Sequence, residues 1–214
     1  MPDENCYAPA MADVRIIAGA DDAQVADWLE ARLASALGQG PAAICVPGGA
    51  TPFPILAELA KRPLDWRSIS IWPTDERLVP ASDPASNIGR IAAILDPVGA
   101  NCVPLSENVR PPRFALAWLG MGADGHIASL FPSADPRAGD SRRVRRLTPS
   151  PLPPEAPYER LTLTIPALLD SEELLFVIRG AAKRQLFDAA MAGGNDLPVA
   201  RLLANARQPV TCFT

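Results

Sequence analysis

Residues 42–59 read AAICVPGGATPFPILAEL, and this stretch decides the fold. Its first five residues form an apolar run typical of a buried strand, and PGGATP is typical of a turn. Thr51 followed by Pro52 indicates an N-cap and a first helical residue, after which apolar side chains recur at helical spacing as far as Leu59. The stretch therefore predicts a strand, a turn and an amphipathic helix in succession.

The same unit recurs along the chain. Further strands are expected at Val14–Ala18, Ser68–Trp72 and Phe114–Leu119, and further helices between Asp21 and Gly38 and over Asn87–Leu95. Later in the chain, RLTLTIPAL and ELLFVI indicate strands, AAKRQLFDAAMA a helix and PVTCFT a last strand. Such alternation favours parallel pairing with right-handed crossovers. We therefore expect one α/β domain over residues 1–214, a Rossmann-like, mainly parallel sheet flanked by helices on both faces.

Residues 139–158 interrupt this pattern, because they combine four arginines with many prolines. Proline removes a backbone donor and breaks regular hydrogen bonding. We expect a surface loop or flap here that connects two halves of the same domain.

The composition disfavours several classes of function. A net charge of −4, from 20 basic and 24 acidic residues, argues against a nucleic-acid partner. No apolar run is long enough to cross a bilayer and the first ten residues lack a signal-peptide pattern, so we expect a cytoplasmic protein with no membrane partner. Cys6, Cys45, Cys102 and Cys212 show no CxxC spacing and are interpreted as reduced thiols. His126 is the only histidine, which excludes the usual catalytic zinc site and leaves carboxylate-bound magnesium as an unsupported alternative.

Three polar segments, residues 47–52, 74–79 and 120–132, each follow the carboxyl end of an expected strand. Open α/β sheets bind ligands at that edge. In the first segment, Gly48 and Gly49 let the backbone come close to a ligand, and the helix start after them offers free N–H groups to an anion such as phosphate. An ordinary capped turn explains this segment equally well, and the lysine of a nucleotide P-loop is absent.

The second segment, TDERLV, places three charged side chains directly after an apolar strand. The Arg77 guanidinium can grip phosphate oxygens bidentately, and Asp75 and Glu76 can orient it. A solvated charged turn is the alternative, and it is favoured when the segment is considered alone.

The third segment, GMGADGHIASLFP, surrounds Asp124 with Gly120, Gly122 and Gly125 and then places His126 at an expected helix start. The glycines permit tight turns and close substrate approach, and their exposed amides can stabilise an oxyanion. An imidazole titrates near neutral pH and can take a proton from water. We therefore interpret His126 as a general base rather than as a core histidine.

Together these segments resemble the recurring pattern of the 6-phosphogluconolactonase family: a GGxTP turn, DERxV followed by SN, and GxGxDGHxASLFP. They stand here as Gly48–Pro52, Asp75–Val79 with Ser86 and Asn87, and Gly120–Pro132. Two weaker matches follow, an R-x-T-x-T strand beginning at Arg160 and a G-x-x-K helix start ending at Lys183. The matches occur in order and span the chain from about residue 42 to 187.

This resemblance implies hydrolysis of 6-phospho-D-glucono-1,5-lactone to 6-phosphogluconate in the oxidative pentose phosphate pathway, without metal or organic cofactor. His126 would activate water and Asp124 would orient it. The implied substrate or phosphate contacts are Gly48, Gly49, Thr51, Asp75, Arg77, Asn87, Gly122, Gly125, Arg160 and Lys183. The partner would be a small phosphosugar lactone, and we expect a monomer or weak homodimer.

The chain departs from the family pattern in three places. Ile127 stands where threonine is commoner, and we expect that hydroxyl to be dispensable. The stretch TPSPLPPEAPYE lacks the family's usual lysine, for which the candidate replacements are Arg142, Arg143, Arg145, Arg146 and Lys183. Only about ten residues lie between Leu105 and Phe114, where the family commonly has a helix.

Two other functions compete with this interpretation. Glucosamine-6-phosphate deaminase is a related enzyme that shares the DGHIA run, but it continues with F-N-E-P, and Phe131 stands here in place of its ring-opening glutamate. A sugar-phosphate-binding regulator without catalysis is the second alternative, against which the intact Asp124-Gly125-His126 run argues.

Overall fold

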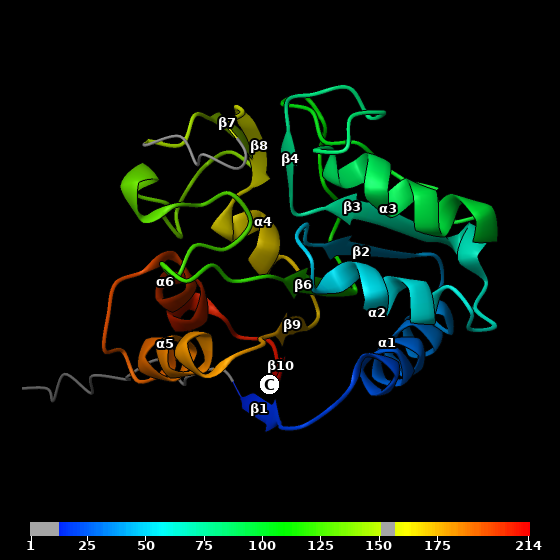
Figure 1. Ribbon diagram of the computed structural model, residues 1–214, viewed down its shortest axis with the longest axis horizontal. Helices are drawn as coiled ribbons and strands as arrows, with labels where there is room; N and C mark the ends of the chain where they lie inside the picture. The colour runs from blue at the N-terminus through cyan, green and yellow to red at the C-terminus, as the bar shows by residue number, and fades with distance from the viewer. Residues whose placement is uncertain (1–12, 151–156) are drawn as a thin grey trace, which may run out of the picture.

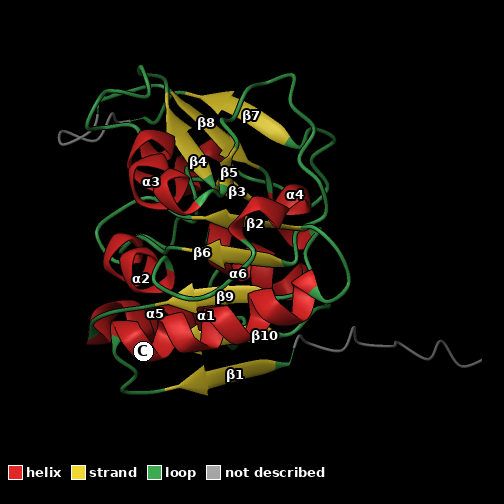
Figure 2. Cartoon of the chain, turned by 90° about the vertical axis from the view of Figure 1, so that its right-hand side faces the viewer, coloured by secondary structure: helices red, strands yellow, loops and turns green. Residues whose placement is uncertain are grey.

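The computed structural model describes residues 13–150 and 157–214. Within them, the main sheet has seven parallel strands in the order β1-β10-β9-β6-β2-β3-β5. The strands are β1 (Val14–Ile17), β2 (Ala42–Val46), β3 (Ile69–Pro73), β5 (Asn101–Cys102), β6 (Leu116–Leu119), β9 (Leu174–Val177) and β10 (Val210–Phe213). Parallel pairing brings their carboxyl ends to one edge of the sheet, as the arrows of β2, β6 and β9 show in Figure 2.

Helices cover both faces of this sheet (Figure 1). One face carries α1 (Asp22–Leu37), α2 (Pro52–Leu59) and α3 (Asn87–Leu95), and the other carries α4 (Ile165–Leu169), α5 (Ala181–Met191) and α6 (Pro198–Asn205). The expected α/β, Rossmann-like architecture is therefore confirmed. Among the described helices, none is both long and apolar enough to span a membrane.

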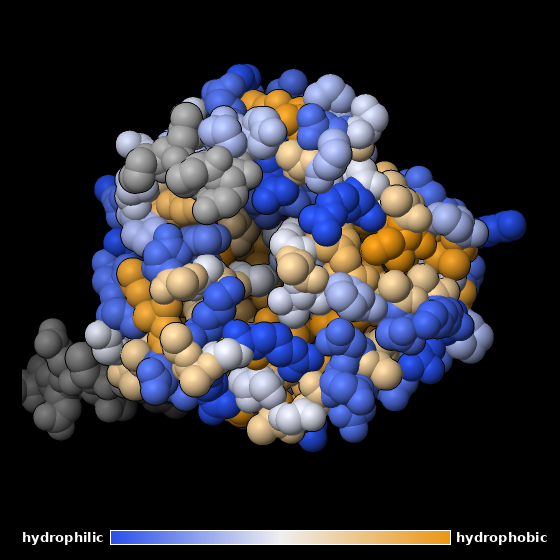
Figure 3. All heavy atoms as spheres, in the orientation of Figure 1, coloured by the Kyte–Doolittle hydropathy of each residue, from blue (hydrophilic) through white to orange (hydrophobic). Residues whose placement is uncertain are grey.

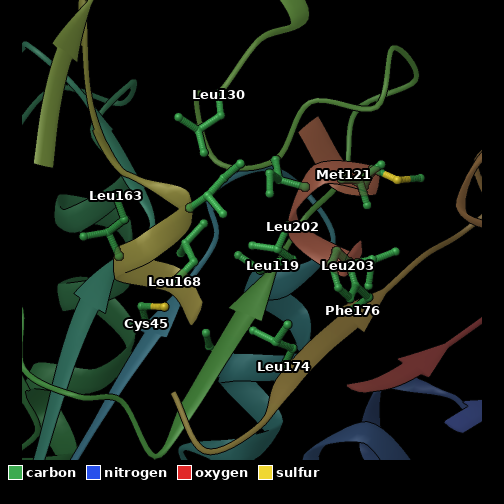
Figure 4. Close-up of a cluster of buried hydrophobic side chains, with 14 of the residues drawn as sticks. Cys45, Leu119, Met121, Leu130, Leu163, Leu168, Leu174, Phe176, Leu202 and Leu203 are labelled. Carbon is green, nitrogen blue, oxygen red and sulfur yellow. The ribbon is translucent and has the colours of Figure 1, made fainter. Parts of the chain in front are cut away.

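Side-chain alternation along the strands divides the core into two clusters. In β6, Leu116 and Trp118 pack toward α1, α2 and α3, whereas Ala117 and Leu119 pack toward α4 and α6. Figure 4 shows Leu119 of the second cluster facing Leu202 and other apolar side chains. The same cluster includes apolar residues of the loop that follows β6, so this loop is anchored to the core.

A small antiparallel sheet lies beyond the main one, in the order β4 (Asp75–Arg77), β8 (Arg160–Leu163), β7 (Val144–Leu147). It excludes one alternative and corrects one prediction. TDERLV begins as a buried strand, because β8 pairs with it from far along the chain, so the alternative of a solvated charged turn is excluded. The stretch 139–158 contains β7 rather than loop alone, although its residues 151–156 lie outside the described part of the chain.

The remaining elements divide between confirmed and wrong predictions. The helix α3 has the predicted bounds, and Asp21 caps α1 in a capping box with Gln24. No helix occurs between β5 and β6, as expected from the short spacing. RLTLTIPAL was predicted as one strand, but β8 ends at Leu163 and α4 follows, because Pro166 is tolerated in a first helical turn. The helix α6 was not predicted.

Candidate functional site

A cavity of about 300 Å³ lies at the carboxyl edge of the main sheet. The space-filling view shows a hollow near the middle of one face, with hydrophilic residues gathered around it (Figure 3). The polar and glycine residues that line the cavity come from four segments of the chain, which include parts of β4, α3 and α5 as well as loops: Gly48, Gly49, Thr51, Asp75, Arg77, Asn87, Gly120, Gly122, His126, Arg179 and Lys183. The three segments singled out in the sequence therefore meet at one place.

The turn after β2 is shaped by close contact with α3. A Cβ at Gly48 would lie 2.2 Å from Asn87 Oδ1, so only glycine fits against this side chain. Gly49 has a φ of +94°, which also favours glycine. The turn thus exposes backbone to the cavity, as the sequence predicted.

Thr51 was expected to cap α2 with its side chain, and this is wrong. Its φ and ψ of −66° and −43° are already helical, and its side chain makes no capping hydrogen bond. An N-cap needs extended backbone to present its oxygen to the N–H groups ahead. Thr51 instead lines the cavity.

Arg77 is held at the cavity by the start of α3. Its Nη1 donates to the backbone oxygen of Ala85 at 2.7 Å and to Asn87 Oδ1 at 3.1 Å. The amide of Asn87 in turn donates to the backbone oxygen of Asp75 at 2.8 Å. Asn87 therefore fixes β4 and the Arg77 guanidinium together, although it is almost fully buried itself.

The two acidic residues of β4 were expected to orient Arg77, and the structure gives them other partners. Glu76 accepts hydrogen bonds from the backbone N–H groups of Asn87 and Ile88, at 2.8 and 2.6 Å, and from Ser86 Oγ at 3.1 Å. A carboxylate at a helix start satisfies free N–H groups and interacts favourably with the helix dipole. Glu76 thus fastens α3 to β4, and it contacts Arg77 only at the backbone N–H.

Asp75 links β4 to the histidine loop. Its Oδ2 accepts a hydrogen bond from Ser129 Oγ at 2.6 Å, and its Oδ1 accepts one from Thr74 Oγ1 at 3.2 Å. The Ser129 backbone N–H also donates to Thr162 Oγ1 on β8. These buried contacts lock the segment after β6 against the small sheet, and they occupy Ser129 as a structural residue.

His126 was expected at a helix start, but it lies in a tight loop. Met121 and Ile127 form an antiparallel bridge, Ile127 also bridges Leu130, and Ala128 has a left-handed φ of 49°, which a helix cannot accommodate. Within this loop the Gly122 N–H donates to the backbone oxygen of His126 at 2.9 Å.

The same loop uses backbone N–H groups that were expected to be free. The Gly125 N–H donates to the backbone oxygen of Gly122, so the N–H groups of both glycines are occupied within the loop. They are therefore not free to stabilise an oxyanion, contrary to the expectation from sequence.

The imidazole of His126 pairs with the carboxylate of Asp124. His126 Nδ1 lies 2.6 Å from Asp124 Oδ1, and the two side chains are 32% and 53% exposed. The ring also packs against Phe131, with centroids 4.8 Å apart. A Cβ at Gly122 would lie 2.2 Å from the imidazole, so this glycine makes room for the pair.

The electrostatics of Asp124 reflect this pairing. Partial burial by itself raises the pKa of Asp124, but the attraction of His126 and the hydrogen bonds from it outweigh burial. The net result is a pKa below the ordinary value for aspartate. Asp124 is therefore a stable anion beside the imidazole at neutral pH.

Two cations reach the cavity from the segment after β9. Lys183 was predicted from the sequence, and Arg179 was missed. Arg179 follows the carboxyl end of a strand just as the three selected segments do, and applying the same rule to FVIRGAAK would have found it.

The other expected residues lie behind or away from the cavity lining. Asp124 stands behind His126, and Gly125, with a φ of +77°, packs against Leu197 at the start of α6. Arg160 is buried in β8 opposite Arg77, and burial together with the charge of Arg77 lowers the pKa of Arg160.

Of the candidates to replace the absent lysine, only Lys183 lines the cavity. The ion pairs of Arg143, Arg145 and Arg146 are with Asp170, Asp140 and Glu159. Ile127 is fully buried beneath the loop, so the residue at this position does not reach the cavity. In the described residues, no group of three or more His, Cys, Asp or Glu side chains is placed to hold a metal ion.

Residues 20–211 match the family described as glucosamine-6-phosphate isomerases/6-phosphogluconolactonase. The chain belongs to this family. A 6-phosphogluconolactonase of Mesorhizobium japonicum is 36% identical over 211 residues, covering 89% of this chain and 87% of that protein. One from Pseudomonas putida is 34% identical over 224 residues, covering 95% and 90%. The structure of 6-phosphogluconolactonase from Thermotoga maritima is similar in fold, with a TM-score of 0.79, 24% identity and coverage of 94% of this chain and 99% of that one.

Membership of the isomerase/lactonase family leaves two chemistries to distinguish, since both names occur in its description. The residue that separates them in the sequence is Phe131, and the structure packs its ring on the imidazole of His126. At this position the chain presents an aromatic ring rather than a carboxylate to the histidine.

Proposed function

We propose that the chain hydrolyses 6-phospho-D-glucono-1,5-lactone to 6-phospho-D-gluconate, the lactone-opening step of the oxidative pentose phosphate pathway. The observation that carries the proposal is the His126–Asp124 pair at a cavity that also holds cationic side chains. The name of the curated relatives supports the same reaction.

His126 acts as general base through Nε2. Its Nδ1 faces the Asp124 carboxylate, which holds the proton on Nδ1 and leaves the lone pair on Nε2. Water attacks the lactone carbonyl carbon as its proton passes to Nε2. When the bond from this carbon to the ring oxygen breaks, the imidazolium returns the proton to that oxygen. Acid–base help of this kind contributes about 10² to 10⁴ in rate.

The phosphate is at the end of the substrate away from the reacting carbonyl, and its binding holds the carbonyl in position. The exposed turn of Gly48, Gly49 and Thr51 offers backbone N–H groups, and Arg77 and Lys183 offer charge. Binding energy from this remote group is what orients the lactone for attack. Arg77 contributes mainly its positive charge at a fixed position, because its Nη1 already donates to Ala85 and Asn87.

A deaminase is the second candidate and is disfavoured by one contact. Ring opening in the related deaminases needs a carboxylate where this chain has Phe131, whose ring lies 4.8 Å from that of His126. We infer that no acid is available there to open an amino sugar. Glucosamine 6-phosphate should therefore release no ammonia when incubated with the protein.

We also propose that the protein works in the cytoplasm. Cys45, Cys102 and Cys212 are free thiols and buried or half-buried, which fits a reducing compartment, while Cys6 lies outside the described residues. Burial raises the pKa of Cys212 to about 12, so this thiol is unreactive.

The decisive measurement is the rate at which purified protein hydrolyses freshly generated 6-phosphogluconolactone above its spontaneous rate, in the presence of EDTA. Wild type should accelerate the reaction despite the chelator, and His126→Gln should lose at least about 100-fold of that acceleration. His126→Gln should unfold cooperatively at a slightly lower melting temperature than wild type, since His126 is partly exposed and only its pairing with Asp124 is lost. A folded wild type that binds 6-phosphogluconate but gives no acceleration would refute the lactonase and favour a binding protein.

A further inference from the structure

Arg179 is a cavity residue that lies outside the motifs described above. It lies just beyond the carboxyl end of β9, after Ile178, and it lines the cavity together with Lys183. Its side chain is 35% exposed, and its Nη2 pairs with Asp22 Oδ1 at 3.2 Å. The ion pair uses Nη2, and within the described part of the chain Nε and Nη1 have no hydrogen-bond partner, so they can donate to a ligand.

The surroundings of Arg179 make an anion favourable there. Lys183 is in the first turn of α5, which begins at Ala181, and Arg179 precedes its N-cap, Gly180. The positive pole of a helix dipole lies at this end, so cations before and within the first turn are unfavourable. Cations at the positive end of a helix go against the usual charge preference, and such exceptions are typical of functional sites. Here a bound anion would supply the negative charge that this helix start favours.

The charge of the substrate calls for more than one cation. A phosphate monoester carries about −1.5 to −2 charges at pH 7. Among the described cavity residues, the cations are Arg77, Arg179 and Lys183, and Arg77 already uses Nη1 to bond Ala85 and Asn87. Arg77 keeps its charge, because both of these partners are neutral oxygens, whereas Arg179 is paired with the Asp22 carboxylate. All three cations are therefore needed to offset that carboxylate and the phosphate.

We propose that Arg179 and Lys183 together bind the phosphate of the substrate, with Arg179 contributing the guanidinium N–H groups that Asp22 does not occupy. This inference rests on the proposed function and extends it to a residue that determines specificity for phosphorylated lactones. It also identifies Arg179, rather than the arginines of residues 142–146, as the cation that joins Arg77 and Lys183 at the site.

Calorimetric binding of 6-phosphogluconate and of glucose 6-phosphate tests the proposal, because both carry the 6-phosphate and only the first carries a carboxylate. In Arg179→Gln, the Kd for both ligands should rise by about tenfold or more, the effect of losing a charge-assisted hydrogen bond. Arg179→Lys should recover part of the affinity. A loss confined to 6-phosphogluconate would overturn the assignment to phosphate.

Two matched variants separate binding from a structural role. Asp22→Asn removes the ion pair but keeps the cation, and its Kd should stay within about twofold of wild type. Arg184→Gln removes a nearby arginine that pairs with Asp188 and lies outside the cavity lining, and it should leave both affinities unchanged. If Asp22→Asn weakened binding as much as Arg179→Gln, Arg179 would be only a tether and the proposal would be wrong.

The lactonase assay on the same proteins distinguishes the two proposals. Unchanged affinities in Arg179→Gln, with an active wild type, would overturn the role of Arg179 alone. Weakened phosphosugar binding in the variant, with an inactive wild type, would overturn the lactonase while supporting Arg179 as a phosphate ligand.

Discussion

Replacing Gly122 by alanine should disable the site without unfolding the protein. The added Cβ would lie 2.2 Å from both Nδ1 and Cε1 of His126 and 2.7 Å from Asp124 Oδ1. Favourable contacts begin at roughly 3.5 Å, so the imidazole must move by about 1 Å or more. A misplacement of about 1 Å at a reacting group can reduce the rate about 100-fold, and we expect kcat/KM to fall by this factor.

The cost in stability should be small. His126 and Asp124 are partly exposed, so the ring can swing toward solvent without leaving a buried cavity. Gly122 is not among the residues with positive φ, so its backbone accepts alanine. The free energy of unfolding should change by about 0.5 kcal/mol or less, as at other surface positions.

The assay compares initial lactone hydrolysis and urea denaturation for wild type, Gly122→Ala and Gly139→Ala. Gly139 is the matched control, because its Cβ would meet no atom within 4 Å. The control should keep full activity and stability. A Gly122→Ala protein with wild-type kcat/KM would show that the His126–Asp124 pair does not act in the arrangement described here.

Three other predictions follow from single contacts. The pKa of Asp124 should rise in His126→Gln, as carbon NMR of the carboxyl would show, because attraction to His126 and its hydrogen bonds overcome burial in wild type. A carboxyl group whose pKa is lowered in the folded state stabilises the fold at every pH above its ordinary pKa. This contribution of Asp124 to stability should be lost as the pH falls through the lowered pKa. Glu76→Gln should lose about 2–3 kcal/mol in urea denaturation, because an amide satisfies the N–H groups of α3 poorly; Glu58→Gln, at the exposed surface, should lose almost nothing. Phe176→Ala should lower stability by about 3–5 kcal/mol in the same experiment, and a much smaller loss would contradict its place in the core.

Much of the fold was predictable because its signals are local. The strand, turn and helix from residue 42 to 59 and the helix α3 follow from the spacing of apolar residues, and Pro52 marks the start of α2. The meeting of three polar segments at one cavity was also predictable, since parallel strands share one carboxyl edge. Arg179 could have been found by the same rule.

Other features could not be read locally. Asp75 and Glu76 look like a solvated turn in sequence, yet both are buried in the folded protein. The start of α3 supplies the partners of the Glu76 carboxylate, and Ser129 of the loop after β6 supplies a partner of the Asp75 carboxylate. RLTLTIPAL alternates like a strand, but all of it except Pro166 is buried, so the alternation does not indicate where β8 ends and α4 begins.

The sequence by itself determined the α/β architecture, the family resemblance and the identity of the histidine, because periodicity and motif spacing are properties of neighbouring residues. Only the tertiary structure decided which groups are free to act. It paired Arg179 with Asp22, occupied the amides of Gly122 and Gly125 within their own loop, and turned Glu76 toward α3. The physical reason is that a hydrogen bond or a charge is assigned by distance in space, and its partner can lie anywhere in the chain.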